Sequence, residues 1–258
     1  MRLAIAGAGG KMGRALIEAT LADRSLELAA ALDAPGSPVV GANIGGVTVG
    51  SDVRAAIAGA DALIDFTRPE GTLAHLEACV AAGKGIVIGT TGFSAAQLSR
   101  IREASQKIPI ALSPNFAVGV NVVFRLAEMA AAALGDSYDV EIIEAHHRQK
   151  VDAPSGTALR LGELVAGALG RSLGDVAAHG REGDVGARPP KQIGFHAIRG
   201  GDIVGEHTVV FAGTGERVEV AVRSQSRATY ATGALRAAKF LREKKNGLYD
   251  MKDVLGLK

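Results

Sequence analysis

The sequence of 258 residues has a single cysteine, and it has no excess of charge of either sign. Because Cys79 has no partner within the chain, an internal disulfide is excluded, and we expect a reducing compartment. The 29 lysines and arginines nearly balance the 27 aspartates and glutamates, for a formal net charge of +2. This balance argues against a protein that binds nucleic acid or a membrane surface through bulk electrostatics.

Long hydrophobic runs and targeting segments are also missing. No apolar run approaches the roughly 20 residues that a membrane helix requires. The apolar stretch at residues 3–6 is too short for a signal peptide and leads directly into glycines. We therefore expect a cytoplasmic protein with no membrane or nucleic-acid partner, long enough for one large domain or two modest ones.

The first half of the chain alternates short apolar strands with helices. Strands are expected at residues 2–7, 26–33, 60–67, 85–92 and 108–115, and helices at 11–22, 69–83 and 94–105. The second of these helices opens on Pro69 and closes on Gly83, which are preferred residues at those positions. Apolar strands that alternate with helices predict a parallel sheet covered on both faces, the doubly wound Rossmann-type α/β fold.

The pattern changes after about residue 116, which predicts a second, α+β domain. Helices are expected at 118–134 and 154–169, and strands at 138–147, 193–199, 203–213 and 217–224. Tight-turn signals between the last strands indicate a mixed or antiparallel sheet. The segment 171–191 is expected to be a long surface loop, and a final helix at 229–244 can pack back on the first domain. The predicted domains are therefore 1–117 plus 227–258, and 118–226.

A glycine-rich loop, AIAGAGGKMGRAL, joins the first strand to the first helix. Gly7, Gly10 and Gly13 fit the pattern G-x-x-G-x-x-G, whereas Met12 stands where the usual G-x-G-x-x-G fingerprint has its third glycine. Either pattern provides a tight turn, close backbone approach to a pyrophosphate, and free N–H groups at a positive helix terminus. We predict a dinucleotide site here; the alternative is an ordinary strand-to-helix turn.

An acidic residue after the second strand supports the dinucleotide interpretation. Asp33 follows the loop by about 20 residues, where a carboxylate accepts hydrogen bonds from the adenosine ribose hydroxyls. Ala34, the next residue, is not an arginine that could hold a 2′-phosphate, which favours NADH over NADPH, although Lys11 could partly offset this. The stretches 89–93 and 113–116 follow later strands, at the sheet edge where ligands bind in this fold.

The segment EAHHRQKVDAPSGTAL, residues 144–159, combines a cationic cluster with a small-residue turn. His146 and His147 face opposite sides of a strand and cannot easily chelate one metal, so we predict no metal site. Lys150 and the first-turn N–H groups after Ser155 form a receptor for a carboxylate or phosphate. Because imidazole titrates near neutral pH, His146 is the candidate proton donor. A hydride-donating nucleotide beside this pocket predicts reduction of a C=C or C=N bond in a small anion.

The signature EAHHRQKVDAPSGTA resembles that of the dihydrodipicolinate reductases, also called 4-hydroxy-tetrahydrodipicolinate reductases, of bacterial lysine biosynthesis. The similarity covers the whole chain, because AIAGAGGKMGR, IDFTRPEGT, GKGIVIGTTGF, NFAVGVNV, GDIVGEHTV and GLYDMKDVLGL resemble family segments in order. It implies formation of tetrahydrodipicolinate from a small dicarboxylate substrate, with hydride from NADH or NADPH and loss of water. It also implies a homotetramer built by strands of the second domain.

The resemblance further implies a role for individual residues. His146 and Lys150 would be catalytic, as proton donors, and the substrate-binding residues would be His147, Gly156, Thr157 and Thr91. The cofactor-binding residues would be Gly7, Ala8, Gly9, Gly10, Lys11, Met12, Asp33, Gly89, Thr90, Thr91, Ser113, Pro114, Asn115 and Phe116. Two departures are visible: Ala34 stands where several members have an arginine for the NADPH phosphate, and Gln149 replaces a basic residue of some relatives.

Two other functions remain open at this point. One is another Rossmann reductase of a small anionic substrate, such as an amino-acid or semialdehyde dehydrogenase. The semialdehyde enzymes need a cysteine nucleophile, and Cys79 lies in the middle of the helix LEACVAAG. A non-catalytic dinucleotide sensor would need no clustered proton donors.

Overall fold

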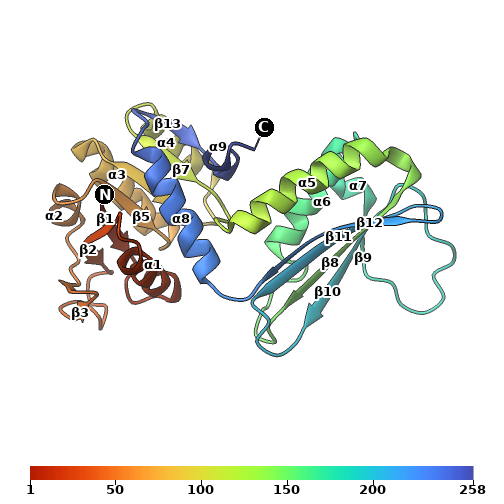
Figure 1. The fold of residues 1–258 in the computed structure, drawn as a ribbon, viewed down its shortest axis with the longest axis horizontal. Coiled ribbons are helices and arrows are strands. Elements are labelled where there is room, and N and C mark those ends of the chain that lie inside the picture. Colours follow the sequence, from red (N-terminus) through yellow and green to blue (C-terminus); the bar gives the residue numbers. More distant parts are fainter. Residues whose placement is uncertain (258) are drawn as a thin grey trace. The chain divides into compact units, whose positions relative to one another are not determined.

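The computed structural model describes residues 1–257, which form two compact units. The first unit consists of Met1–Val118 together with the C-terminal segment from Arg227, and the second consists of Gly119–Ser226. The chain therefore leaves the first unit, builds the second as one continuous stretch, and returns (Figure 1).

The first unit is built on a six-stranded sheet in which every pairing is parallel. Its strand order is β13-β7-β6-β5-β1-β2, with β1 Arg2–Ala6, β2 Glu27–Leu32, β5 Ala62–Asp65, β6 Gly85–Ile88, β7 Pro109–Leu112 and β13 Gly247–Tyr249. After β2 the chain crosses to the other side of β1, so the strand order reverses between β1 and β5. Ligands bind at the carboxyl ends of the strands at such a switch point.

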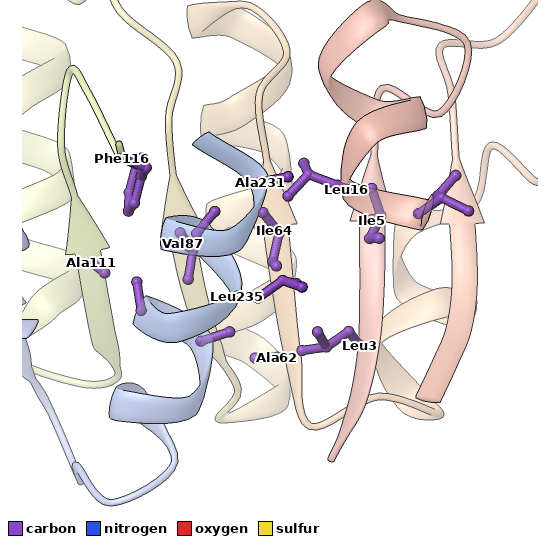
Figure 2. Packing of buried hydrophobic residues seen from close by; sticks show 14 of the residues in the cluster. Leu3, Ile5, Leu16, Ala62, Ile64, Val87, Ala111, Phe116, Ala231 and Leu235 are labelled. Atoms are coloured by element: carbon purple, nitrogen blue, oxygen red, sulfur yellow. The ribbon is translucent and has the colours of Figure 1, made fainter. Parts of the chain in front are cut away.

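Helices cover both faces of this sheet, as the apolar strands require. They are α1 Lys11–Ala22, α2 Val53–Ala58, α3 Pro69–Ala82, α4 Ala95–Ser105, α8 Ala228–Leu241 and α9 Met251–Leu255. Alternate strand residues face opposite layers: Ile5 and Ile64 pack with α1 and α8, whereas Leu63 packs in the cluster that contains α2, α3 and α4 residues. Figure 2 shows Ala231 and Leu235 of α8 lying over the first of these layers.

Sequence patterns at helix ends explain where these helices start and stop. Pro69 occupies the first turn of α3, and Gly83 ends it in the left-handed conformation, as predicted. Ser94 caps α4 in a capping box with Gln97. The small hairpin of β3 Asn43–Ile44 and β4 Val47–Thr48 was not predicted, because two-residue strands carry no detectable alternation.

The second unit contains a five-stranded mixed sheet in the order β12-β11-β8-β10-β9. Its strands are β8 Asp139–His146, β9 Ala177–His179, β10 Ile193–Arg199, β11 Gly205–Ala212 and β12 Arg217–Ser224, and its helices are α5 Val118–Leu134, η1 Gly135–Ser137, α6 Gly156–Ala168 and α7 Leu173–Val176. β8 pairs parallel with β10 and antiparallel with β11. The predicted fold class, a Rossmann-type sheet plus an α+β domain on a mixed sheet, is confirmed.

Two expectations for this unit were wrong in part. The segment 171–191 is not all loop, because it contains α7 and β9, and β9 pairs parallel with β10.

The second correction concerns the expectation that no apolar run approaches the length of a membrane helix. The stretch Val118–Ser137 is 20 residues long with a mean hydropathy of 1.4, so by length and composition alone it could cross a membrane. It carries the Arg125–Glu128 ion pair at 3.2 Å and buries Val120, Phe124 and neighbours within the structure.

The sheet of the second unit has one face packed against helices, and no helix among residues 1–257 packs on its other face. α6 packs against β8, β10 and β11, and Phe195 fills the space over Gly162, where a methyl group would lie 2.5 Å from its ring. On the opposite face, Ile143 and Ile198 are 37% and 52% exposed. This opposite face is called the open sheet face below.

Candidate active site

In the first unit, the glycine loop turns sharply between β1 and α1. Gly7 has a φ of +78°, which glycine adopts readily, and its carbonyl accepts a hydrogen bond of 2.9 Å from the Gly10 N–H. A methyl group on Gly13 would overlap the Gly7 carbonyl group and come within 2.9 Å of the Ala8 Cα. No described side chain caps α1 at Gly10, so the positive helix terminus faces outward for an anion.

Asp33 meets this loop, as its position after β2 predicts. Its Oδ2 accepts a hydrogen bond of 2.7 Å from the Gly9 N–H, and its Oδ1 accepts one of 2.8 Å from the Ala34 N–H. A methyl group on Gly9 would lie 2.9 Å from Oδ2. The carboxylate, the bare glycine backbone and the uncapped helix end fit the ribose and pyrophosphate of a pyridine nucleotide.

The loops after β5, β6 and β7 form the rest of this sheet edge. The Gly89 N–H donates to the Asp65 carbonyl at 2.8 Å, and a methyl group on Gly89 would overlap the Phe66 ring. The Phe66 and Phe116 rings lie 5.6 Å apart. After β7, the Ser113 Oγ donates to the Asn115 carbonyl at 2.8 Å, which fixes the predicted stretch 113–116 in a turn.

A buried carboxylate that we did not predict supports this edge from below. Asp65 is fully buried at the end of β5, and it accepts hydrogen bonds from the N–H and Oγ1 of Thr67 at 2.8 and 2.7 Å. Its other oxygen lies 2.6 Å from His75 Nδ1. Thr72 bonds both Asp65 and the Oγ1 of Thr90, so the predicted cofactor residue Thr90 is tied into the same network. The sequence pattern that could have identified Asp65 is a carboxylate at the end of an apolar strand.

In the second unit, three neighbouring strands bring a group of ionisable side chains together. Glu144 and His146 lie two residues apart on β8, so they share a face of the strand. The strand register places Arg199 of β10 beside His146, and His207 of β11 beside Glu144. The His146 Nδ1 lies 2.6 Å from the Glu144 Oε2, and the rings of His146 and His207 meet edge to face at 5.1 Å.

This group connects directly to the start of α6. The Ser155 N–H donates to the Glu144 Oε1 at 3.1 Å, and the Ser155 Oγ shares a hydrogen bond of 2.9 Å with the His207 Nε2. The same Oγ accepts from the Ala158 N–H, so Ser155 caps the helix as its sequence position predicts. Space is open above Gly156, where a methyl group would touch nothing within 4 Å.

Two further predicted residues, His147 and Lys150, lie on the turn between β8 and α6. The Lys150 Nζ is paired with both carboxylate oxygens of Asp152, at 2.7 and 2.8 Å. The buried Nδ1 of His147 has no hydrogen-bond partner among the described residues. Groups of histidine, cysteine and acidic residues that could hold a metal ion are absent from residues 1–257.

Electrostatics within the group have a clear direction. Burial lowers the pKa of His146 below its ordinary value, while Glu144 acts in the opposite sense and Lys150 and Arg199 lower it further. Burial alone would raise the pKa of Glu144, but hydrogen bonds from Arg199 and His146 outweigh it and hold that pKa below its usual range. Burial, with the nearby His146, lowers the pKa of His207 to about 4. The group therefore contains one firmly ionised carboxylate and two imidazoles that resist charging.

The low pKa of His207 predicts a loss of stability in mild acid. The unfolded imidazole titrates near pH 6.5, so the unfolded state binds the proton first as pH falls. The stabilisation that comes from keeping His207 neutral is complete above pH 6.5. The free energy of unfolding should therefore fall by about 3 kcal/mol as the pH is lowered from 6.5 to 4. His207→Gln should flatten this slope in urea titrations at several pH values, and His179→Gln, an exposed control, should keep it. An unchanged slope in His207→Gln would contradict the assignment.

Comparisons with known proteins agree with this geometry. The family model "Dihydrodipicolinate reductase, N-terminus" matches residues 1–116, and "Dihydrodipicolinate reductase, C-terminus" matches residues 119–255. The chain belongs to the dihydrodipicolinate reductase family. The 4-hydroxy-tetrahydrodipicolinate reductase of Aromatoleum aromaticum is 59% identical, over 100% of this chain and 96% of its own. That of Cupriavidus necator is 57% identical over the full length of both.

Solved structures place the fold in the same family. A dipicolinate-bound dihydrodipicolinate reductase from Paenisporosarcina sp. TG-14 matches with a TM-score of 0.82 and 27% identity over 98% of each chain. A probable dehydrogenase from Thermotoga maritima, at 11% identity and a TM-score of 0.63, shares the fold alone. The predicted family, and with it the enzyme class of NAD(P)H-dependent oxidoreductase, are confirmed.

The family assignment also decides between the functions left open by the sequence. Cys79 is fully buried among Ile86, Ile101 and other apolar side chains, and burial raises the pKa of its thiol, so it is an inert core residue and not a nucleophile. A family of reductases likewise excludes the non-catalytic sensor.

Proposed function

We propose that this chain reduces 4-hydroxy-tetrahydrodipicolinate to tetrahydrodipicolinate, with loss of the 4-hydroxyl as water, in lysine and diaminopimelate biosynthesis. The observation that carries the proposal is the placement of His146 beside the open start of α6, bridged by Glu144. The activity named for relatives of 57–59% identity supports it, as does the dipicolinate bound to the Paenisporosarcina protein.

In this proposal the first unit binds NADH or NADPH. The loop from Gly7 to Met12 faces the pyrophosphate, Asp33 accepts hydrogen bonds from the ribose, and the turns at Gly89–Thr91 and Ser113–Phe116 flank the nicotinamide. The bound nucleotide supplies a hydride to C4 of the conjugated imine that remains after water is lost. The protein's part at this edge is to hold the loop residues in place, and the Asp65 network does this through the Thr90 hydroxyl.

The second unit binds the dicarboxylate substrate and supplies the proton. The N–H groups of Gly156 and Thr157 at the start of α6, with His147, hold a carboxylate, and Lys150 adds positive charge. Hydride addition at C4 moves electron density toward the ring nitrogen end. His146, with Lys150 as a second donor, protonates the resulting enamine. A well-placed donor stabilises the charge that develops in the transition state by a few kcal/mol. Because substrate carboxylates favour the charged imidazole, their arrival opposes the burial that lowers the pKa of His146.

The same proposal includes a cytoplasmic homotetramer. The open sheet face exposes Ile143 and Ile198 among charged and small side chains, and apolar patches of this kind mark protein–protein contacts. A second copy of the same sheet would cover it face to face. Sedimentation equilibrium, which gives the mass of the assembly, tests this.

The proposed NADH preference gives a defined prediction at Ala34. The substitution Ala34→Arg should lower the KM for NADPH about tenfold, because a guanidinium beside Asp33 can pair with the 2′-phosphate. Ala34→Gln, of similar length without charge, should leave it unchanged. Steady-state kinetics with both nucleotides measure the effect. If NADPH use does not improve, Lys11 or another group sets the preference.

The proposed reaction is tested by following oxidation of NADH, and of NADPH in parallel, with substrate generated in place from pyruvate and aspartate semialdehyde by the preceding synthase. We expect turnover that requires the synthase, faster with NADH at low nucleotide concentration. Nucleotide binding without turnover would reject the proposed substrate and leave the nucleotide site in place.

A further inference from the structure

Glu144 is a buried carboxylate of the second unit that accepts four hydrogen bonds, and the proposed mechanism does not use it directly. It is 1% exposed, and both of its oxygens are engaged. Oε2 accepts hydrogen bonds from the His146 Nδ1 at 2.6 Å and from the Arg199 Nη1 at 2.7 Å. Oε1 accepts hydrogen bonds from the Arg199 Nη2 at 2.6 Å and from the Ser155 N–H at 3.1 Å. A buried carboxylate with this many donors is held in one geometry.

Arg199 extends this arrangement to the turn before α6. Besides the two-pronged contact with Glu144, its Nη2 donates to the Asp152 carbonyl at 2.7 Å. The turn residues 152–155 are thus bonded at two points, one to Arg199 and one to Glu144. Three segments therefore meet at one carboxylate: β8 through His146, β10 through Arg199, and the turn through Ser155, the N-cap of α6.

We infer that Glu144 is a positioning residue, whose single carboxylate sets the distance between the proton donor His146 and the carboxylate receptor at the start of α6. The inference rests on the proposed function for the roles of those two groups. A carboxylate on Nδ1 fixes the ring orientation and directs Nε2 toward the reacting molecule. The same carboxylate fixes the Ser155 N–H, and with it the direction of the first-turn N–H groups of α6. Proton delivery and substrate binding are therefore coupled through one side chain.

Electrostatics give this role a second, measurable signature. The charged and titratable groups that face His146 are Glu144 on its own strand, Arg199 on β10, His207 on β11 and Lys150 on the turn. Among them only Glu144 favours the protonated imidazole. Removal of the Glu144 charge should lower the pKa of His146, and removal of the Arg199 charge should raise it. Damage to the fold would not produce opposite signs.

The test compares Glu144→Gln with Glu141→Gln. Glu141 lies on the same strand but on the open sheet face. It pairs with two arginines and a histidine, whereas Glu144 pairs with one arginine and one histidine, so its substitution removes similar contacts away from the site. Glu144→Gln should lower kcat about 10- to 100-fold and raise the substrate KM, with NADH affinity unchanged. Glu141→Gln should retain kcat and KM.

Histidine-selective NMR titration supplies the readout that does not depend on turnover. The His146 midpoint should move to more acidic pH in Glu144→Gln and to more alkaline pH in Arg199→Gln, and it should stay in place in Glu141→Gln. Should Glu144→Gln fail to fold, Arg199→Gln still tests the sign.

The outcomes separate the two proposals. An unmoved His146 midpoint with wild-type kcat in Glu144→Gln, or equal losses in Glu141→Gln, would overturn the positioning role. The expected NMR shifts in a protein that turns over no substrate would retain the link between Glu144 and His146 and reject the proposed function.

Discussion

Replacing His146 with glutamine is expected to lower turnover about 10²-fold or more, with NADH affinity nearly intact. Glutamine can occupy the space beside Glu144, but its amide does not release a proton to the reduced substrate. The nucleotide residues lie in the other compact unit, so their contacts are unaffected. Steady-state kinetics and a separate titration of NADH binding by fluorescence measure the two effects.

Two other histidines serve as controls for this experiment. His147→Gln, at a residue proposed to bind substrate, should act mainly on the substrate KM. His179→Gln, at the exposed end of β9, should change neither constant. Unchanged turnover in His146→Gln would remove His146 from the chemistry and leave Lys150 as the candidate donor.

The second large effect is expected at Gly13, where Gly13→Ala should destabilise the first unit and weaken NADH binding more than tenfold. The added methyl group would overlap the Gly7 carbonyl and crowd the Ala8 Cα, and backbone atoms cannot move aside as a flexible side chain can. Such overpacking costs about 1–3 kcal/mol or more. It also moves α1 away from the loop whose N–H groups face the pyrophosphate.

Gly50→Ala is the matched control, because a methyl group there touches nothing within 4 Å and the residue lies in the same unit. Thermal unfolding and isothermal titration with NADH measure both variants. Wild-type stability and affinity in Gly13→Ala would show that the close approach of α1 to the loop is not needed.

The sequence predicted those features that depend on neighbours along the chain. The two periodicities and the Pro69 and Gly83 signals placed the long elements, and the spacing from Gly7 to Asp33 placed the loop and the acid that meet in the structure. Very short elements were missed: β9 exists through its pairing with β10, and the β3–β4 hairpin consists of two strands of two residues each. Their residues carry too little pattern of their own.

The candidate site shows the same division. His146, Lys150 and the α6 start lie close together in the sequence and were predicted from it. Arg199 and His207 lie more than fifty residues further along, and only the register of β10 and β11 against β8 brings them to His146. Glu144 could have been predicted as a neighbour of His146, because residues two apart on a strand share a face. Lys150 differs from expectation in being paired with Asp152.

The route of the chain through its two units has a consequence for synthesis. The helix α8 and the edge strand β13 belong to the first unit, yet they are translated after the whole of the second. Until α8 emerges, the layer of Ile5, Ile64 and Val87 that it covers stays uncovered (Figure 2). The unit that begins first is thus completed last, and a nascent chain carries an unfinished apolar surface, of the kind that chaperones bind, through most of its time on the ribosome.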